Sequence, residues 1–179
     1  KRLMLDLCDE VAVVAQLAGA VNTVVVQGGR LLGYNTDGHG LLASLKNEAG
    51  VEPAGRDFML IGSGGAAGAA LAALVLAGAR SVAVMSRNEQ HAVDLVERML
   101  PHARRTEIVA IAQGPGAESF VERADVVINA TPVGMQPNDP LPLDPEWVHS
   151  GQVVCDMIYA PIRTRLMHEA ERAGATAIS

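Results

Sequence analysis

The stretch that decides the fold is Phe58-Met-Leu-Ile-Gly62-Ser-Gly64-Gly65-Ala-Ala67-Gly68. A short apolar run breaks into glycines and continues as Ala and Leu at helical spacing, which predicts a strand, a tight turn and a helix. This order is typical of the first β-turn-α unit of a dinucleotide-binding domain. We expect Gly62 to allow the sharp turn, Gly64 to let a pyrophosphate approach the backbone, and Ala67 to keep the helix close to the sheet.

The pattern Gly-x-Gly-x-x-Ala is by itself a weak signal, because the same string occurs in ordinary tight turns. Its context strengthens it: no proline interrupts the helical run before Pro101, and a second strand-like run over 81–85 follows at the distance of a βαβ unit. A helix N-terminus also offers free N–H groups and partial positive charge to phosphates. We therefore predict that a nucleotide contacts this turn and the start of its helix, at Gly62, Ser63, Gly64, Gly65, Ala66 and Ala67.

Apolar strand runs and helical runs alternate from residue 57 onward. Strands are expected near 57–61, 81–85, 107–111, 125–129 and 152–155, and helices near 65–78, 88–99, 116–122 and 163–173. The strand runs are continuously apolar, as expected when helices cover both faces of a parallel sheet. We predict an α/β fold with a doubly wound parallel (Rossmann) sheet. The segment 130–145 holds five prolines, and a functional loop at the carboxyl edge is favoured there over a plain connector.

The first 54 residues show a different organisation. Apolar positions at helical spacing predict a helix over residues 2–17 that ends at Gly19, and a strand pair over 22–26 and 30–34 joined by a glycine turn. A further helix should begin after a cap at Thr36 or Asp37 and end near Gly50. Residues 51–55 are expected to form a hinge, which divides the chain into 1–54, part of a second α/β lobe, and 55–179, the nucleotide-binding domain.

Composition excludes several classes of protein. The 179 residues carry a net charge of −6 and no basic cluster, which argues against nucleic-acid binding. No apolar run reaches the length of a membrane span and no signal-peptide pattern opens the sequence. The two cysteines have no metal-ligand spacing to the five histidines, so reduced buried thiols, no metal and a cytoplasmic location are expected.

The second predicted strand of the nucleotide-binding domain ends Met85-Ser86-Arg87-Asn88. In NAD-binding domains a carboxylate at this place holds the ribose hydroxyls, whereas an arginine accommodates the 2′-phosphate of NADP. Arg87 offers a forked cation and no carboxylate is present, so we predict NADP, with Ser86, Arg87 and Asn88 in the cofactor site. The alternative is a solvated Arg87 with Ser86 or Asn88 as a helix cap, and both interpretations can hold together.

Several motifs in order resemble one family. They are Gly19-Ala-Val-Asn22-Thr, Asn35-Thr-Asp37-Gly, the glycine-rich turn, Ser86-Arg87-Asn88, Asn129-Ala-Thr131-Pro and Asp156-Met157-Ile-Tyr159. Each string is common alone, but the ordered set covers nearly the whole chain and resembles the shikimate dehydrogenases of the shikimate/quinate dehydrogenase family. The resemblance implies NADPH-dependent, reversible reduction of 3-dehydroshikimate to shikimate in aromatic amino acid biosynthesis.

The resemblance also implies roles for individual residues. A lysine and an aspartate face each other across the cleft of these enzymes, and they correspond to Lys1 and Asp37 as catalytic residues. Asn22 would hydrogen-bond the substrate hydroxyls and Tyr159 would point at the substrate. Thr131 would line the cofactor site and Met157 would pack near the nicotinamide. Tyr159 follows a strand run at the expected ligand edge, although a half-buried packing tyrosine is equally compatible with its position.

Some family features are absent from this sequence. Ser86 stands where the family often has Asn, which should weaken cofactor contacts. A serine motif for the substrate carboxylate belongs before Lys1 and a closing helix belongs after Ser179, so we expect a fragment of the enzyme. The alternatives are an NAD-using quinate/shikimate dehydrogenase and a nucleotide-binding module without catalysis. A homodimer is compatible with the sequence, which leaves the oligomeric state open.

Overall fold

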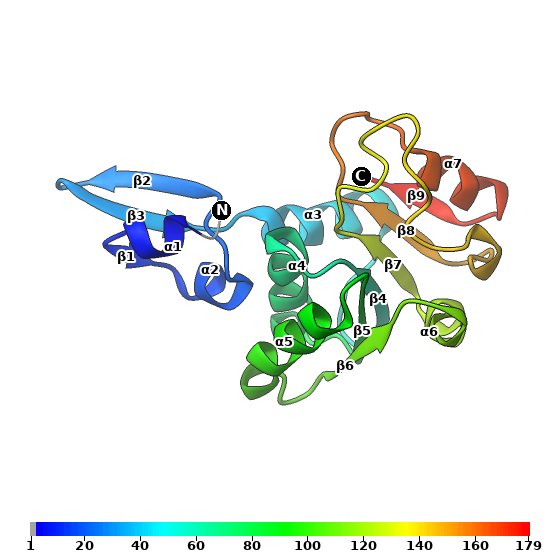
Figure 1. Ribbon diagram of the computed structural model, residues 1–179, viewed down its shortest axis with the longest axis horizontal. Coiled ribbons are helices and arrows are strands. Elements are labelled where there is room, and N and C mark those ends of the chain that lie inside the picture. Colours follow the sequence, from blue (N-terminus) through cyan, green and yellow to red (C-terminus); the bar gives the residue numbers. More distant parts are fainter. Residues whose placement is uncertain (1–2) are drawn as a thin grey trace.

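The computed structural model describes residues 3–179, and within them two separate sheets form (Figure 1). The larger sheet has six parallel strands in the order β6-β5-β4-β7-β8-β9. Because β4, β5 and β6 extend to one side and β7, β8 and β9 to the other, the strand order reverses between β4 and β7. This is the doubly wound topology of the Rossmann fold. The strands are β4 (Asp57–Ile61), β5 (Ser81–Ser86), β6 (Glu107–Ala112), β7 (Val126–Asn129), β8 (Val153–Asp156) and β9 (Thr176–Ile178).

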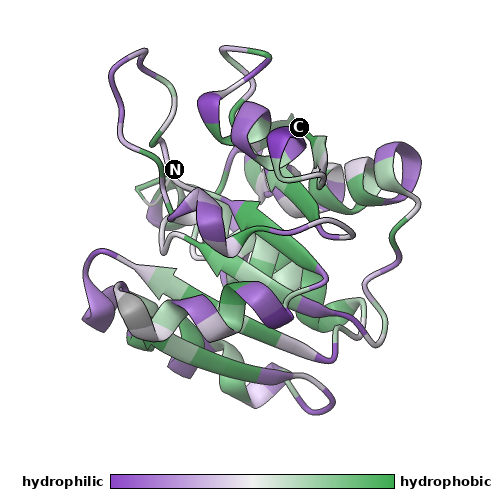
Figure 2. Cartoon of the chain, turned by 90° about the vertical axis from the view of Figure 1, so that its right-hand side faces the viewer, coloured by the Kyte–Doolittle hydropathy of each residue, from purple (hydrophilic) through white to green (hydrophobic). Residues whose placement is uncertain are grey.

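Helices cover both faces of this sheet. Phe58 and Leu60 face a core that includes Leu45 and Leu71, whereas Met59 and Ile61 face a second core with α6 and α7. Apolar residues therefore occupy both faces of β4, and Figure 2 shows the central strands as hydrophobic along their length. The helices are α3 (Asp37–Ala49), α4 (Gly65–Leu76), α5 (Glu89–Met99), α6 (Glu118–Arg123) and α7 (Arg165–Arg172), with 3₁₀ turns at Leu100–His102, Pro115–Ala117 and Pro145–Trp147.

The helix α4 packs unusually closely against its neighbours. A Cβ built on Gly68 would lie 2.2 Å from the carbonyl oxygen of Ala18 in α2 (Val13–Ala18). A Cβ built on Gly38 would lie 2.6 Å from the carbonyl oxygen of Ala69. Glycine at these two positions lets α2 and α3 approach α4 until backbone meets backbone. The Ala- and Gly-rich sequence of α4 thus ties the N-terminal segment to the six-stranded sheet.

The N-terminal part has a three-stranded sheet in the order β1-β3-β2, in which β1 is Glu10–Val11. The predicted hairpin is confirmed: β2 (Thr23–Gln27) and β3 (Arg30–Tyr34) pair antiparallel around Gly28 and Gly29, and Figure 1 shows this hairpin extending away from the six-stranded sheet. The helix after it begins and ends as predicted, with Gly50 at its C-terminus in the left-handed conformation. Thr36 occupies the N-cap position, but its side chain makes no capping bond; the Oδ1 of Asn35 accepts from the Asp37 N–H instead.

The prediction of one helix over residues 2–17 is wrong for the described residues. The chain instead forms α1 (Met4–Leu7), β1 (Glu10–Val11) and α2 (Val13–Ala18), and α2 ends at Gly19 as predicted. β1 pairs in parallel with β3, Glu10 opposite Leu32, so hydrogen bonds to another strand override the helical periodicity at this point. The short strand β9 was not predicted. It pairs in parallel with β8 at the edge of the large sheet.

Candidate functional site

A cavity of about 390 Å³ opens at the carboxyl edge of the six-stranded sheet, where the strand order reverses. Most of its wall comes from the turn between β4 and α4, the end of β5, and the irregular segment that follows β7; His91 in α5 and Gln113 after β6 complete it. Open α/β sheets bind ligands at this place. Seven of the residues predicted to contact the cofactor line the cavity: Gly62, Ser63, Gly64, Ser86, Arg87, Asn88 and Thr131.

The glycine-rich turn has the geometry that its sequence predicts. Gly62 has a φ of +121°, and a Cβ there would lie 3.1 Å from the backbone of Ala130. Gly64 is the N-cap of α4, and a Cβ there would meet no other group within 4 Å. The Gly64 side-chain position is therefore open space that a ligand can use. Ala67 is fully buried in the core, so it keeps α4 close to the sheet.

Gly65 and Ala66 are the first two residues of α4. They are half-buried and do not line the cavity. Together with Gly64 they place the helix N-terminus, with its free N–H groups, beside the open space.

The end of β5 supplies the cationic part of the wall. Ser86 Oγ lies 2.9 Å from Ser63 Oγ and joins the two loops. Arg87 is exposed and lines the cavity, while Asn88 caps α5 by accepting from the Gln90 N–H at 3.1 Å. Asn88 therefore has the capping role that the sequence left open. His91, which the sequence analysis missed, also lines the cavity and contacts Asn88; it follows that cap by three residues, one helical turn.

Asp37 and Asn22 lie in direct contact near the start of α3. The Nδ2 of Asn22 donates to Asp37 Oδ1 at 2.5 Å and to Thr36 Oγ1 at 3.2 Å. The Oδ1 of Asn22 accepts from the Thr36 N–H and from Thr23 Oγ1. Two residues that the resemblance placed in the active site thus meet, one just before β2 and one at the start of α3. Lys1 lies outside the described residues.

Tyr159 and Met157 follow β8. Tyr159 is 85% exposed, so its side chain lies in solvent. Met157 is half-buried against the core on the α4 side of the sheet, and its N–H donates to the carbonyl oxygen of Asn129. Neither residue lines the 390 Å³ cavity.

A buried polar network lies beneath the cavity. Asn129 and Asp156 end adjacent strands, are 0% and 1% exposed, and share a hydrogen bond of 3.0 Å. Burial raises the pKa of Asp156 above its ordinary value, although hydrogen bonds from Thr164, the Ile158 N–H and Asn129 favour its charged form. The sequence analysis quoted both residues within motifs but gave them no role; a polar residue ending an apolar strand was the available signal.

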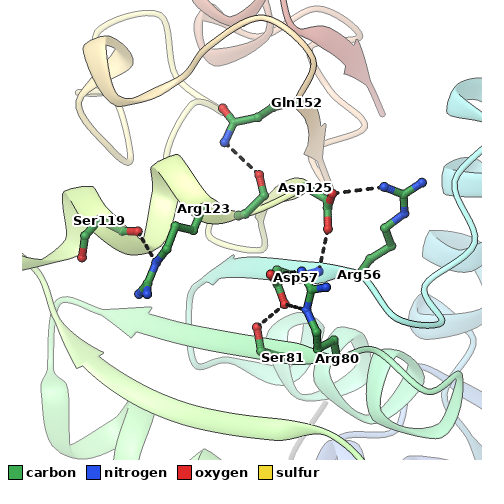
Figure 3. A network of polar contacts seen from close by, with 9 residues as sticks. Arg56, Asp57, Arg80, Ser81, Ser119, Arg123, Asp125 and Gln152 are labelled. Atoms are coloured by element: carbon green, nitrogen blue, oxygen red, sulfur yellow. Dashed lines mark hydrogen bonds and ion pairs between the residues drawn. The ribbon is translucent and has the colours of Figure 1, made fainter.

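A second network ties the opposite, amino ends of the strands (Figure 3). Arg80 pairs with Asp57, Ser81 Oγ donates to Asp57 at 2.7 Å, and Asp125 accepts from Arg56 and from the Asp57 N–H. These contacts hold β4, β5 and the start of β7 together away from the cavity. Among residues 3–179, no group of three His, Cys, Asp or Glu side chains is placed to hold a metal ion. No helix in that range is long and apolar enough to span a bilayer.

The sheet order, the glycine turn and the cavity at the point of reversal define a Rossmann-type α/β protein of the dinucleotide-binding kind. Residues 44–135, just over half of the chain, match the family model described as shikimate / quinate 5-dehydrogenase. The chain belongs to this family.

Known members of the family resemble the chain along its whole length. The NADP(+) shikimate dehydrogenase of Methanopyrus kandleri is 38% identical over 181 residues, which cover 100% of the chain and 62% of that relative. A shikimate 5-dehydrogenase from Thermus thermophilus, solved with NADP(H) and shikimate, has a TM-score of 0.81 at 34% identity, covering 99% and 62% of the two chains. The quinate dehydrogenase of Corynebacterium glutamicum, solved with NAD, has a TM-score of 0.86 at 31% identity, covering 99% and 63%. The chain thus spans about three fifths of the relatives it matches.

Proposed function

We propose that the chain is the cofactor-binding part, with some of the substrate site, of an NADP-dependent shikimate dehydrogenase. The enzyme would reduce 3-dehydroshikimate to shikimate reversibly in aromatic amino acid biosynthesis. One observation carries the proposal: Asp37 is bonded to Asn22, and the neighbouring Gly38 packs against α4, the helix that begins at the cofactor turn. The proposed catalytic carboxylate is therefore fixed relative to the proposed cofactor site. The NADP(+) relatives and the NADP(H)–shikimate complex of the Thermus enzyme support the same assignment.

The residues present fit NADP. Gly64 leaves open space beside the N-terminus of α4, where a pyrophosphate can accept backbone N–H bonds. Arg87 lies at the end of β5, where a 2′-phosphate would be recognised, and residues 86–88 contain no carboxylate to hold the ribose of NAD. Bound NADPH would supply the hydride. Of the other proposed cofactor contacts, Thr131 lines the cavity, and Gly65, Ala66 and Met157 are half-buried; the fully buried Ala67 would act only by holding α4 against the sheet.

The protein's own part in the reaction is to orient the substrate and to move a proton. An unperturbed lysine, with a pKa near 10.4, is charged at neutral pH, and a carboxylate beside it favours that charge. We propose that Lys1 protonates the carbonyl oxygen, that Asp37 orients Lys1, and that the neutral amine of Lys1 accepts the proton in the reverse direction.

The proposed substrate contacts come from Asn22 and Tyr159. Both Nδ2 hydrogens of Asn22 already have acceptors, at 2.5 and 3.2 Å, so a substrate hydroxyl would replace the longer bond to Thr36. The bond to Asp37 can then persist while substrate is bound. The exposed Tyr159 hydroxyl is available to a substrate that approaches from outside the large sheet.

The proposal extends to organisation and surroundings. Residues 1–54 would belong to a substrate-binding lobe and residues 55–179 to the cofactor domain. The six parallel strands all lie in the second range and the other sheet lies in the first. The net charge of −6 supports a small-molecule partner without nucleic acid, and we propose a cytoplasmic enzyme that can form homodimers.

The test uses the chain extended at both ends to the length of its relatives, with shikimate and NADP⁺ as substrates and NADPH absorbance as readout. Asp37→Asn should lower the turnover number by about a hundredfold or more and leave the NADPH dissociation constant unchanged, because proton transfer contributes about 10²–10⁴. The matched control is Glu48→Gln, an exposed carboxylate change on the same helix, which should be silent. Lys1→Ala should resemble Asp37→Asn, and the double variant should be little worse than the worse single one. Retention of most activity by Asp37→Asn would contradict the assignment, and NADPH binding without turnover would favour a non-catalytic module.

A further inference from the structure

The buried carboxylate of Asp156 has no part in the proposed reaction. It ends β8 directly beside Asn129, the last residue of β7, and both side chains are shielded from solvent. Isolated carboxylates are rarely buried, because removing charge from water is costly unless hydrogen bonds replace the hydration. Asp156 does not line the cavity, so any role at the site must act through the groups that bond to its two oxygens.

Asn129 uses its whole hydrogen-bonding capacity. Its Oδ1 accepts from the N–H and the Oγ1 of Thr131, at 3.1 and 2.7 Å. Its Nδ2 donates to the carbonyl oxygen of Val133 at 3.1 Å and to Asp156 Oδ1 at 3.0 Å. Thr131 Oγ1 in turn accepts from the Val133 N–H. Thr131 and Val133 both line the cavity, so Asn129 shapes its wall directly.

Asp156 accepts from three directions. Its Oδ1 receives Asn129 Nδ2 and, at 3.2 Å, the N–H of Ile158. Its Oδ2 receives Thr164 Oγ1 at 2.7 Å, and Thr164 caps α7 by accepting from the Met167 N–H. The two oxygens therefore bond to different segments: Oδ1 to Asn129, whose partners line the cavity, and Oδ2 to the cap of α7.

The side-chain hydrogen bonds of Asn129 and Asp156 stand where a helix or strand would have backbone hydrogen bonds. Between β7 and the 3₁₀ turn at Pro145–Trp147 the chain has no helix or strand, and four prolines remove N–H donors from it. The first residues of this segment therefore depend on side-chain hydrogen bonds for their conformation. Asn129 provides two of these bonds, to the Thr131 N–H and the Val133 carbonyl oxygen, and Thr131 Oγ1 accepts from the Val133 N–H. Asp139 accepts from the N–H groups of the later residues Gly134 and Gln136. The Asn129 amide is itself oriented by Asp156.

We propose that Asp156 is a positioning residue of the nucleotide site: its Oδ1 orients the Asn129 amide, which fixes Thr131 and Val133 in the cavity wall. The inference rests on the proposed function, because the affinity for NADPH is its readout. The role requires an acceptor at Oδ1 and is independent of the bond between Oδ2 and Thr164.

Three variants of the chain test this with NADPH as the probe, each followed by fluorescence titration and thermal unfolding. Asp156→Ala removes both oxygens and should raise the NADPH dissociation constant about tenfold, the size expected for loss of one well-placed hydrogen bond. Asp156→Asn keeps an oxygen for Asn129 while its amino group turns to Thr164, so it should stay within about threefold of the wild type. Thr164→Val is the matched control: it removes the buried hydroxyl and the α7 cap, lowering the melting temperature, but should leave NADPH affinity within about twofold.

A double-mutant cycle separates positioning from general destabilisation. If Asp156 acts through Asn129 on Thr131, the affinity losses of Asp156→Ala and Thr131→Val should not multiply, although the two side chains share no direct bond. The inference would be overturned if the affinity losses of Asp156→Ala and Thr131→Val multiplied in the double variant. It would also be overturned if Asp156→Ala and Thr164→Val had equal melting temperatures and lost equal affinity. Either result would leave the proposed function intact. Failure of the wild-type chain to bind NADPH would overturn the proposed function, and this inference with it.

Discussion

Replacing Gly64 and Gly68 with alanine, one at a time, distinguishes a glycine needed by a ligand from a glycine needed by the fold. Both belong to the same turn and helix, four residues apart. A Cβ on Gly64 would meet nothing within 4 Å, whereas a Cβ on Gly68 would lie 2.2 Å from the carbonyl oxygen of Ala18. Gly64→Ala should therefore weaken cofactor binding without changing stability, whereas Gly68→Ala should lower stability.

The expected magnitudes follow from this geometry. Gly64 has extended backbone (φ −81°, ψ −170°) that alanine adopts freely. Alanine is a poorer N-cap by about 0.5–1 kcal/mol, but it restricts the unfolded chain by about 0.4–1 kcal/mol, so the net change in unfolding free energy is about zero. At Gly68, overpacking against backbone costs about 3 kcal/mol and the gain in helix propensity offsets about 1 kcal/mol. The net loss of about 2 kcal/mol should lower the melting temperature by about 4–8 °C in a chain of this size.

Cofactor affinity should depend on Gly64. A methyl group at Gly64 would separate a pyrophosphate from the helix N–H groups, and losing charge-assisted hydrogen bonds costs about 1.5–3 kcal/mol, or about 10–150-fold in affinity. Thermal unfolding by circular dichroism and titration with NADPH measure the two quantities. A Gly64→Ala protein as unstable as Gly68→Ala, or one that binds NADPH like the wild type, would refute this account of the turn.

Three further predictions concern the network at the amino ends of the strands and the loop near β8. Both ring nitrogens of His149 lie within 2.9 Å of carbonyl oxygens, those of Ser150 and Glu122, and these oxygens raise the pKa of His149 above 6.5. The contribution of His149 to stability should be complete below pH 6.5 and lost as the pH rises through its pKa in the folded state. His149→Gln should remove this step from the pH profile of unfolding. Arg80 holds the pKa of Asp57 below 3.8, so the stabilisation from their ion pair is present above pH 3.8 and lost at lower pH. Arg80→Gln should destabilise the protein at neutral pH and flatten the dependence of its stability on pH in acid, as measured by denaturant unfolding. Gln152→Leu should lower the free energy of unfolding by about 2–3 kcal/mol in urea titrations, because the carbonyls of residues 121 and 124 lose their buried donor.

The central fold could be predicted because its signals are local. β4 and β5 are apolar on both faces, and the glycines at 62 and 64 mark the turn that follows β4, so each element was recognisable without knowing its neighbours. The N-terminal segment was mispredicted because β1 has two residues and exists only through its pairing with β3. β9 has only three residues and likewise depends on its pairing with β8.

The residues of the candidate site also fall into those that local sequence signals predicted and those that depend on tertiary contacts. The residues at 62–64 and 86–88 line the cavity as their strand-end positions predict. Asn22 and Asp37 are 15 residues apart; the family resemblance placed both in the active site, but the hydrogen bond between them was not predicted. The hydrogen bond between Asn129 and Asp156 forms because β7 and β8 are neighbours in the sheet. Neither composition nor periodicity reveals the order of the strands. Close packing at Gly38 and Gly68 was missed for the same reason, since it requires knowing where α2 and α3 meet α4.

The most direct test of the NADP assignment is a parallel titration of the wild-type chain and Arg87→Ala with NADPH and NADH. Only NADPH carries the 2′-phosphate, and the loss of a charge-assisted bond is worth about 1.5–3 kcal/mol. The wild type should therefore bind NADPH at least about tenfold more tightly than NADH, and Arg87→Ala should abolish that preference by weakening NADPH alone. Equal affinities of the wild type for the two cofactors, or equal losses for both in Arg87→Ala, would contradict the assignment.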